Sequence, residues 1–291
     1  MLTAVIPSTN RAGVLHETVI SLARQTRRPD EILISVVDAE RDVLEATREL
    51  PGVRVVTGPK GSTHQRNTAI DHLHPACTLV SFLDDDVELH REYLGHCYEF
   101  MSKHSEIAGM SGRAVADGTL IGEVTREKAI RLLADVEAAA TTYQPCYAME
   151  GFDMTVRREI ADRVRFDERL SLYALYEDFD FSVRAKRYGQ LVMVDGCLLV
   201  HLRTGSSRMS AVRLGYAQLV NPVYLWWKGS QALYPSLRIC ARSLSGNVLG
   251  CLVARRGITR SERRQRLWGN ALGLRDLMVS GPQPESIRRI G

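Results

Sequence analysis

Short strand-like runs alternate with helical patterns over the first 90 residues, and this alternation constrains the fold more than any other feature of the chain. The expected elements are strands at Leu2–Ile6, Glu31–Val37, Val53–Thr57 and Thr78–Leu83, separated by helices at Val14–Gln25, Arg41–Leu50 and Ser62–Leu73. Strands that alternate with helices predict a mostly parallel sheet with helices on both faces. We therefore expect an α/β fold for this part of the chain.

Polar segments follow three of these strands. Pro7-Ser8-Thr9-Asn10 follows the first strand, Asp38 the second, and Asp84-Asp85-Asp86 the fourth. Ligands bind to open α/β sheets beyond the carboxyl ends of the strands. The three segments are therefore candidates for one shared ligand site.

The acidic cluster Asp84-Asp85-Asp86 carries the strongest local signal. Adjacent carboxylates repel one another unless a cation joins them, and oxygen ligands select Mg²⁺ or Mn²⁺, which bridge substrate phosphates. The alternative is an acidic turn with solvated side chains, because short acidic motifs are common. The cluster therefore needs support from other residues.

His201 ends the apolar run Val194–Val200 and is the candidate second metal ligand, beside Asp86. Arg203 follows it and would meet a pyrophosphate. A lone histidine at a strand end is more often structural. This interpretation therefore requires Asp86 and His201 to meet in the fold.

Glu177 and Asp178 open a helix predicted at Tyr176–Tyr188. Acids in a first helical turn are stabilised by the helix dipole, so a structural explanation is available. The functional interpretation makes Asp178 a general base that takes a proton from an acceptor hydroxyl, in the same cleft as the metal.

The sequence lacks the signatures of several classes of protein. Gly58-x-x-Gly61-Ser62 is neither a dinucleotide-binding nor a P-loop motif, and no nucleophile elbow or H-E-x-x-H pair is present. The six cysteines are scattered without a C-x-x-C pair, which argues against a zinc knuckle and suits a reducing cytosol. No signal peptide is recognisable, and no apolar stretch reaches the ~20 residues of a spanning helix.

The chain is expected to divide into a catalytic domain at 1–205, with halves at about 1–90 and 91–205, and a mainly helical extension at 206–291. In the second half we expect a strand edge and then a helix at Leu120–Glu137, an extended Tyr147–Val156, and strands at Leu191–Val194 and Leu198–His201. The tail from Gly281 is expected to be frayed.

Charge is unevenly distributed along the chain. From Leu202 onward fifteen Lys and Arg residues accompany three acids, a net charge of +12; since the whole chain carries +4, residues 1–201 carry −8. A basic helical segment with Trp226, Trp227 and Trp268 fits an anionic membrane surface or a lipid-linked diphosphate acceptor. The alternative is a packed appendage with solvated arginines. We expect a cytoplasmic protein, peripheral at the inner face of the membrane if the surface binds lipid, and a homodimer is a further expectation.

Taken in order, the motifs resemble the family 2 glycosyltransferases and their GT-A fold, a Rossmann-like, mostly parallel sheet flanked by helices. The resemblance runs from Val5 to about His201, and each motif is weak alone but the order is specific. The matching segments are Pro7-Ser8-Thr9-Asn10-Arg11, Asp38, Arg66-Asn67, Phe82–Val87, Gly151–Arg158, Phe166–Leu170, and Glu177–Phe181 with Arg184 and Tyr188-Gly189.

The resemblance implies a role for each matching residue. Pro7, Thr9, Arg11 and Asp38 would line the nucleoside pocket, and Arg66 would support the nucleotide. Asp84 and Asp85 would face the ribose and the sugar, while Asp86, with His201, would ligate Mn²⁺ or Mg²⁺ on the diphosphate. Asp178 would be the base, with Glu177 beside it. Asp38-Ala39-Glu40-Arg41 departs from the family pattern at the second strand.

The implied reaction is metal-assisted transfer of one sugar from a UDP-, GDP- or dTDP-linked donor to a saccharide or lipid-linked acceptor, with inversion. Bacterial polysaccharide or glycolipid assembly would use such a step. The alternatives are a retaining enzyme on the same fold, a sugar-phosphate nucleotidyltransferase, and a basic lipid- or nucleic-acid-binding module. The first strand is not followed by the Gly-rich basic loop of a nucleotidyltransferase, and the binding module leaves Asp86 and Asp178 without a role. We expect no nucleic-acid partner.

Overall fold

We describe a computed structural model of the chain, which places residues 1–37, 52–136, 142–204, 209–252 and 258–290. The helix predicted at Arg41–Leu50 and the candidate residue Asp38 lie outside this described part. Its strands are β1 (Leu2–Pro7), β2 (Glu31–Val37), β3 (Val53–Gly58), β4 (Leu79–Leu83), β5 (Val87–Leu89), β6 (Ile107–Asp117), β7 (Tyr143–Pro145), β8 (Asp153–Arg157) and β9 (Gln190–His201).

In the described residues these strands form one sheet in the order β3-β2-β1-β4-β8-β6-β9-β5, with β7 paired to β9. The four strands predicted in the first 90 residues are confirmed, and they run parallel to one another. The second half is mixed: β8 is antiparallel to both β4 and β6, whereas β6 and β9 are parallel.

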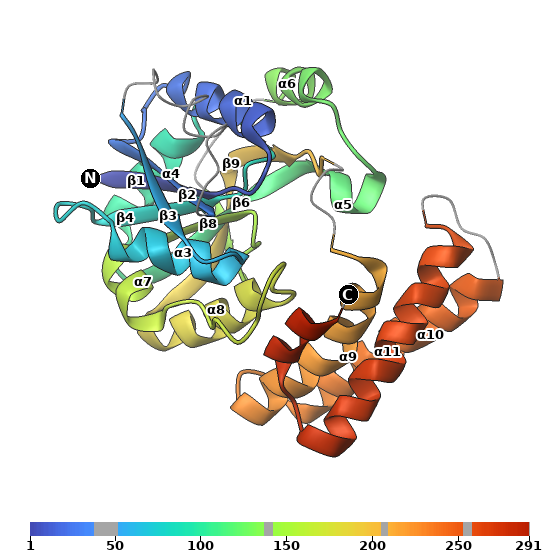
Figure 1. Cartoon of the computed structure of the whole chain (residues 1–291). Coiled ribbons are helices and arrows are strands. Elements are labelled where there is room, and N and C mark those ends of the chain that lie inside the picture. Colours follow the sequence, from blue (N-terminus) through green and yellow to red (C-terminus); the bar gives the residue numbers. More distant parts are fainter. Residues whose placement is uncertain (38–51, 137–141, 205–208, 253–257, 291) are drawn as a thin grey trace. The chain divides into compact units, whose positions relative to one another are not determined.

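Helices cover both faces of the sheet (Figure 1). Side chains alternate along a strand. Ala4 and Ile6 of β1 therefore pack in one core cluster, together with Leu15 of helix α1 (Ala12–Ala23). Val5 packs on the opposite face of the sheet, with Ile70 of helix α3 (Ser62–Asp71). The helices are α1 (Ala12–Ala23), α3 (Ser62–Asp71), α4 (Tyr93–Lys103), α5 (Gly118–Ile121), α6 (Arg126–Ala134), α7 (Arg158–Val164) and α8 (Glu177–Ala185), which continues into the 3₁₀ turn η1 (Lys186–Tyr188).

Three predictions for the middle of the chain differ from the structure. Leu120 lies in the helical turn α5 rather than at a strand edge, because the Asp117 carboxylate accepts the Thr119 N–H (2.8 Å) and caps the turn. The extended segment predicted from Tyr147 begins only at Asp153. The two strands expected on either side of residues 195–197 are one strand, β9, whose register against β6 shifts between Gly112 and Arg113.

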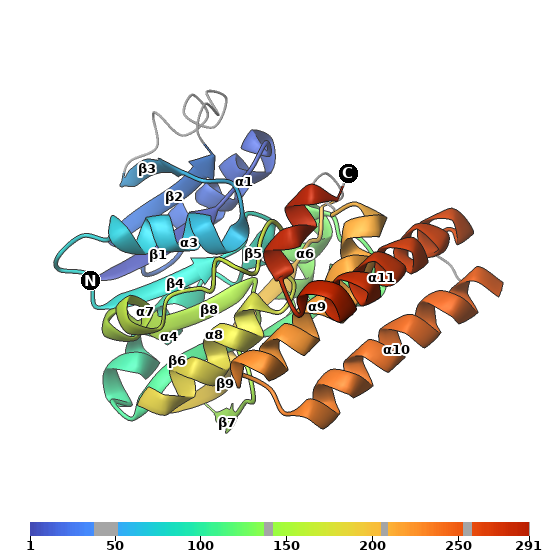
Figure 2. The same cartoon turned by 60° about the horizontal axis from the view of Figure 1, so that its bottom comes forward.

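The structure divides into two compact units, comprising residues 1–60, 64–166 and 181–207, and residues 61–63, 167–180 and 208–291. The second unit contains the long helices α9 (Ala211–Lys228), α10 (Leu233–Leu252) and α11 (Arg260–Ser280), which lie side by side in Figures 1 and 2. The tail predicted to fray instead forms the 3₁₀ helix η3 (Pro284–Arg289), because Ile287 is buried with Tyr216 and Val220 of α9. In the described residues, no helix is both long enough and apolar enough to cross a membrane.

Candidate active site

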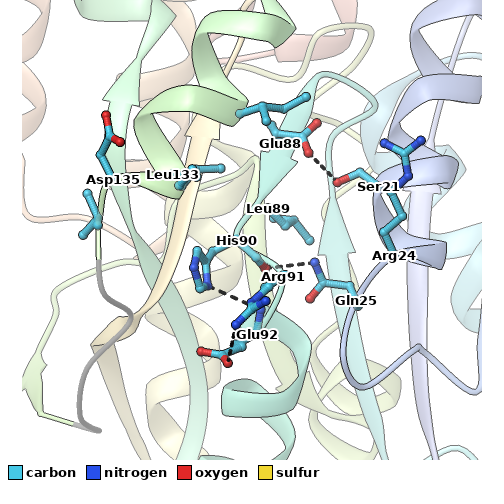
Figure 3. Close-up of a pocket in the computed structure, with 13 residues that line it drawn as sticks. Ser21, Arg24, Gln25, Glu88, Leu89, His90, Arg91, Glu92, Leu133 and Asp135 are labelled. Atoms are coloured by element: carbon cyan, nitrogen blue, oxygen red, sulfur yellow. Dashed lines mark hydrogen bonds and ion pairs between the residues drawn. The ribbon is translucent and has the colours of Figure 1, made fainter.

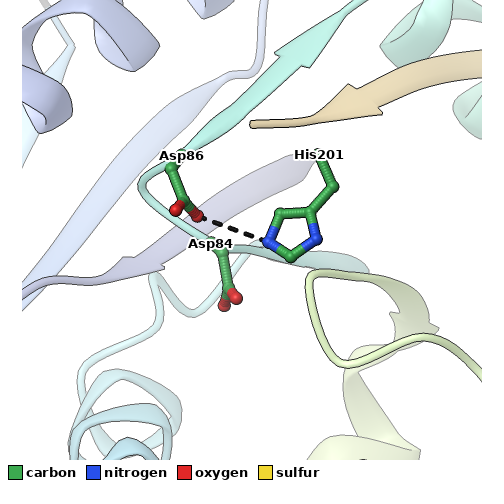
Figure 4. A group of neighbouring side chains, drawn as sticks. All are labelled: Asp84, Asp86 and His201. Carbon is green, nitrogen blue, oxygen red and sulfur yellow. Dashed lines mark ion pairs between the residues drawn. The ribbon is translucent and has the colours of Figure 1, made fainter. Parts of the chain in front are cut away.

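The carboxylates of Asp84 and Asp86 and the imidazole of His201 meet at the carboxyl ends of β4 and β9 (Figure 4). One candidate ligand atom from each residue lies within 4.8 Å of the others. Asp86 and His201 come together because β5 continues from the acidic cluster and pairs antiparallel with β9, with Val87 opposite His201. The resulting distance between Asp86 Oδ1 and His201 Nε2 is 3.6 Å.

The His201 ring is fixed from two further sides. Its Nδ1 lies 2.9 Å from Asp117 Oδ1, at the end of β6. The Phe152 ring stacks on the imidazole at a centroid distance of 4.4 Å and an interplanar angle of 18°. Because an ionised carboxylate only accepts hydrogen bonds, Asp117 places the hydrogen on Nδ1 and leaves Nε2 directed at the acidic cluster.

Asp85 and Asp86 are engaged by residues that follow β1. Asp85 is buried and accepts from Ser8 Oγ (2.6 Å) and Arg11 Nη1 (2.5 Å). Arg11 Nη2 also donates to Asp86 Oδ2 at 2.8 Å. Thr204, just past His201, donates its backbone N–H to the same Asp86 oxygen at 3.0 Å. The loop after β1 and the end of β9 are thereby joined through the acidic cluster.

Arg66 of α3 supports the third acid. Its buried guanidinium donates to Asp84 Oδ1 (3.1 Å) and to the Gly151 carbonyl (2.6 Å). Asp84 retains more exposure than its neighbours, with 37% of its side chain accessible against 7% for Asp86. Asp84 is therefore the acid of the cluster that a ligand reaches from solvent.

Burial and opposite charge set the protonation of the site. Burial raises the pKa of Asp85 to about 7, in spite of the Arg11 charge beside it. Burial opposes ionisation of Asp86 as well, but the neighbouring imidazole of His201 and the charge of Arg11 hold its pKa well below the usual range. Burial lowers the pKa of His201, yet Asp86, Asp84 and Asp117 outweigh this and raise it to about 9.

The donor set fits a divalent cation. Two carboxylates and one imidazole supply hard oxygen atoms and a borderline nitrogen atom, which suit Mn²⁺ and Mg²⁺. The hydrogen bond between His201 and Asp117 is the kind of outer contact that orients a metal-binding histidine. The roles of Asp86 and His201 as ligands stay predictions.

The other predicted donor-site residues lie near this edge or outside the described part. Pro7 ends β1. Thr9 Oγ1 lies 3.4 Å from Gln65 Oε1. The amide nitrogen of Gln65 donates to the carbonyls of Ser8 and Ser35. Arg203 donates to the carbonyls of Gly118 and Thr119 in α5. Asp38 lies outside the described residues. Their contacts with a donor stay predictions.

Glu177 and Asp178 belong to the second unit and open α8 as expected. Glu177 is buried, and its carboxylate accepts the N–H of Asp178 at 2.9 Å. The preceding loop holds Leu172, Ala174 and Tyr176 at positive φ (63°, 52° and 74°), a conformation that costs free energy in non-glycine residues. The catalytic role of Asp178 stays a prediction.

A hollow of about 780 Å³ in the first unit is lined by none of the predicted site residues (Figure 3). It is lined by the end of α1, by β5 and the turn after it, and by the end of α6. Glu88 lies on its wall, where it accepts from Ser21 Oγ (2.8 Å) and pairs with Arg126. None of its described lining residues belongs to a group of acids, histidines or cysteines close enough together to hold a metal ion.

Sequence reasoning missed Asp117, Phe152, Ser8 and Thr204. Ser8 lies within the strand-end segment that was recognised, and its hydroxyl was an available signal. Asp117 ends the strand Ile107–Asp117, and an acid at a strand end is the pattern that identified Asp38 and Asp86. Phe152 lies within the matched segment Gly151–Arg158 but, like Thr204, gave no sign of its contact with the site, because the pairing of β4 with β8 and of β5 with β9 brings both residues there.

The mixed sheet and the candidate metal-binding cluster of Asp84, Asp86 and His201 together define an α/β glycosyltransferase of the GT-A class. Residues 3–165 match glycosyl transferase family 2, and the chain belongs to this family.

Solved structures with a similar fold include the following two. A mannosyltransferase from Pyrobaculum calidifontis, described in complex with GDP-mannose and Mn²⁺, aligns with a TM-score of 0.56 at 15% identity, over 94% of this chain and 87% of its own. S. aureus TarS, residues 1–349, aligns with a TM-score of 0.52 at 16% identity, over 96% of this chain and 72% of its own. No curated protein with a similar sequence was found.

Proposed function

We propose that this enzyme transfers one sugar from a nucleoside-diphosphate donor to an acceptor hydroxyl, with a divalent cation at Asp86 and His201, and with inversion at the anomeric carbon. The observation that carries the proposal is the meeting of Asp84, Asp86 and His201 at the carboxyl edge of the sheet. The Mn²⁺ and GDP-mannose described for the mannosyltransferase of similar fold support a nucleotide-sugar donor and favour Mn²⁺.

The residues of the first unit would hold the donor. Asp86 and His201, with Asp84, would hold the cation, which when bound neutralises the charge that develops on the departing diphosphate. Pro7, Thr9 and Asp38 would contact the nucleoside. Asp84 is accessible enough to meet ribose or sugar hydroxyls, whereas Asp85 would act through Ser8 and Arg11 by fixing the loop after β1.

Asp178 would take the proton of the acceptor hydroxyl as its oxygen bonds to the anomeric carbon and the bond to the diphosphate breaks. One such displacement inverts the configuration, and its transition state has oxocarbenium character. Strained backbone persists where the surrounding structure imposes it and clusters at active sites, so the positive φ angles of Leu172, Ala174 and Tyr176 support a functional role for this loop.

Product analysis tests this function. The purified enzyme is incubated with Mn²⁺, UDP-, GDP- and dTDP-linked sugars in turn, and saccharide or lipid-linked acceptors. Release of nucleoside diphosphate, with a product whose anomeric configuration by NMR is opposite to that of the donor, is expected. Retained configuration would refute the single displacement, and release of pyrophosphate would indicate a nucleotidyltransferase instead.

A further inference from the structure

Helix α10 buries polar side chains and exposes large apolar ones, which is the reverse of the usual arrangement in a helix of a water-soluble domain. Its inward positions carry small or polar residues, and Ser236 and Asn247 are fully buried. Its outward positions recur at helical spacing and carry large apolar side chains that are 42–75% exposed, namely Tyr234, Leu237, Leu244, Val248 and Leu249. A helix that covers an aqueous protein core has the opposite pattern.

The inward face is polar because of how α9, α10 and α11 pack. Asn247 of α10 and Asn270 of α11 hydrogen-bond each other at 2.9 Å, and Asn270 also donates to the Gly215 carbonyl of α9 at 2.7 Å. Both asparagines lie in the same short sequence, Gly-Asn-x-Leu-Gly, at 246–250 and 269–273. Packing of helices through small residues and buried amides leaves large apolar side chains for the outer surface.

The neighbourhood of this outer face is basic. Arg238 and Arg242 are exposed along one side of the apolar stripe, and α10 contains no acid. In the sequence, no Asp or Glu occurs between Asp195 and Glu262. An amphipathic helix with an apolar stripe, flanking arginines and an exposed aromatic residue, here Tyr234, is suited to the interface of an anionic bilayer.

We propose that the outer face of α10, defined as Tyr234, Leu237, Leu244, Val248 and Leu249 with Arg238 and Arg242, docks on the surface of a membrane that contains anionic lipid. The helix lies in the plane of the interface, since it is not apolar enough to cross a membrane. A second copy of the chain fits less well, because pairing through this face brings the arginines of both copies together without acids from either helix. Docking is independent of the proposed transfer reaction.

Vesicle flotation of the full chain, without donor or acceptor, tests the proposal. The vesicles consist of phosphatidylcholine alone or of phosphatidylcholine mixed with phosphatidylglycerol. The wild-type chain should float with the mixed vesicles and little with the neutral ones. Arg238→Gln with Arg242→Gln should weaken binding about fivefold per arginine, about twenty-fivefold together, and flatten its dependence on salt. Leu244→Glu with Val248→Glu should weaken it more than about tenfold.

Matched controls carry the same changes elsewhere on the surface. Arg28→Gln with Arg91→Gln removes two exposed arginines of the first unit, and Ile130→Glu places an acid on an exposed apolar position of α6. Controls should float like the wild type, and thermal melts should show that every variant is folded. Failure of the wild type to bind mixed vesicles, or equal losses in α10 and control variants, overturns the proposal. The proposal is also overturned if the chain does not bind vesicles but forms a dimer in solution, and Leu244→Glu with Val248→Glu dissociates that dimer.

Discussion

His201 is held by three different chemical contacts, an arrangement that a purely structural histidine does not need. Asp117 accepts from Nδ1, Phe152 stacks on the ring, and Nε2 faces Asp86. The contact with Asp117 keeps a hydrogen on Nδ1, the stacking with Phe152 fixes the tilt of the ring, and the contact with Asp86 fixes the direction of Nε2. We therefore propose that Asp117 is a positioning residue, which would act on the proposed cation site through His201.

Asp117→Asn should weaken Mn²⁺ binding ten- to hundredfold, because the amide gives a weaker hydrogen bond to Nδ1 than the carboxylate does. Asparagine still caps α5, so the fold should be preserved. Calorimetric titration with Mn²⁺ in the presence of nucleoside diphosphate measures the affinity. Asp162→Asn, an exposed acid of α7, is the control. Unchanged Mn²⁺ affinity in Asp117→Asn would show that His201 does not depend on this contact.

Asp178→Asn should lower the rate of transfer by a factor of about 10² to 10⁴, the contribution typical of a general base. Donor affinity should change little, since Asp178 is proposed to meet the acceptor and not the diphosphate. Single-turnover kinetics and donor titration separate the two effects. Turnover equal to that of the wild type would exclude Asp178 as the base.

At the level of secondary-structure elements, a buried acid joins β8 to β6 and α4. Asp153 is fully buried, bonds the hydroxyl of Tyr93, and accepts the Gly112 N–H at 2.5 Å. Burial raises its pKa to about 7. The same residues adjoin the point where the register of β9 shifts against β6, upstream of His201.

This raised pKa predicts a stability that falls with pH. Between the unfolded pKa and a folded pKa of about 7, the folded chain keeps a proton that the unfolded chain has lost, so the free energy of unfolding decreases by up to about 1.4 kcal/mol per pH unit. Asp153→Asn should reduce the slope while it keeps both contacts. The raised pKa of Asp85 adds to the slope in both proteins. Urea unfolding across this range measures it, and an unaltered slope in Asp153→Asn would contradict the assignment.

Local sequence patterns were sufficient for the elements whose environment is local. The strands of the parallel half alternate or run apolar and end at polar segments, so their bounds and the place of the acidic cluster could be predicted from the residues alone. The bounds of β6 and β8, in the mixed half of the sheet, could not be predicted in this way, because these strands are paired by contacts distant in sequence. The outer contacts of the site, Asp117 and Phe152, come from that half, and for this reason they were missed.

The apolar stripe of the last third shows the same limit. In the sequence, apolar residues after residue 236 recur at helical spacing and predict a helix, which is confirmed as α10; they are Leu237, Cys240, Ala241, Leu244, Val248, Cys251 and Leu252. The pattern did not reveal which side faces inward, since a buried asparagine is not an apolar signal. In the structure Cys240 contacts the Leu219 carbonyl of α9, whereas Leu237, Leu244 and Val248 are exposed.

On the scale of the whole molecule, the second unit is built from distant parts of the sequence. Lys228 at the end of α9 contacts Asp167 Oδ2 and Asp180 Oδ2 at 2.5 and 2.9 Å, and Ser230 donates to Asp180 at 2.6 Å. The segment that precedes and begins α8 is therefore held by the helices that follow residue 208. The helical part supports the loop that carries the proposed base.

Lys228→Met should destabilise the protein by about 3–5 kcal/mol, because it leaves the fully buried Asp180 and the nearby Asp167 without their cation. Lys103→Met makes the same change in an exposed pair with Glu99 and should cost far less, because solvent screens that pair. Denaturant titration measures both free energies of unfolding. Equal values for the two variants would show that the network does not support the unit.

The central claim is that Asp84, Asp86 and His201 form one cation site for a nucleoside diphosphate, and calorimetry of Asp86→Asn tests it most directly. The wild-type enzyme should bind UDP, GDP or dTDP in the presence of Mn²⁺ and lose this binding with a chelator. In Asp86→Asn, Mn²⁺-dependent binding should fall more than about tenfold, while the exposed control Asp162→Asn should bind like the wild type. Binding by the wild type that is indifferent to Mn²⁺, or undiminished in Asp86→Asn, would contradict the account.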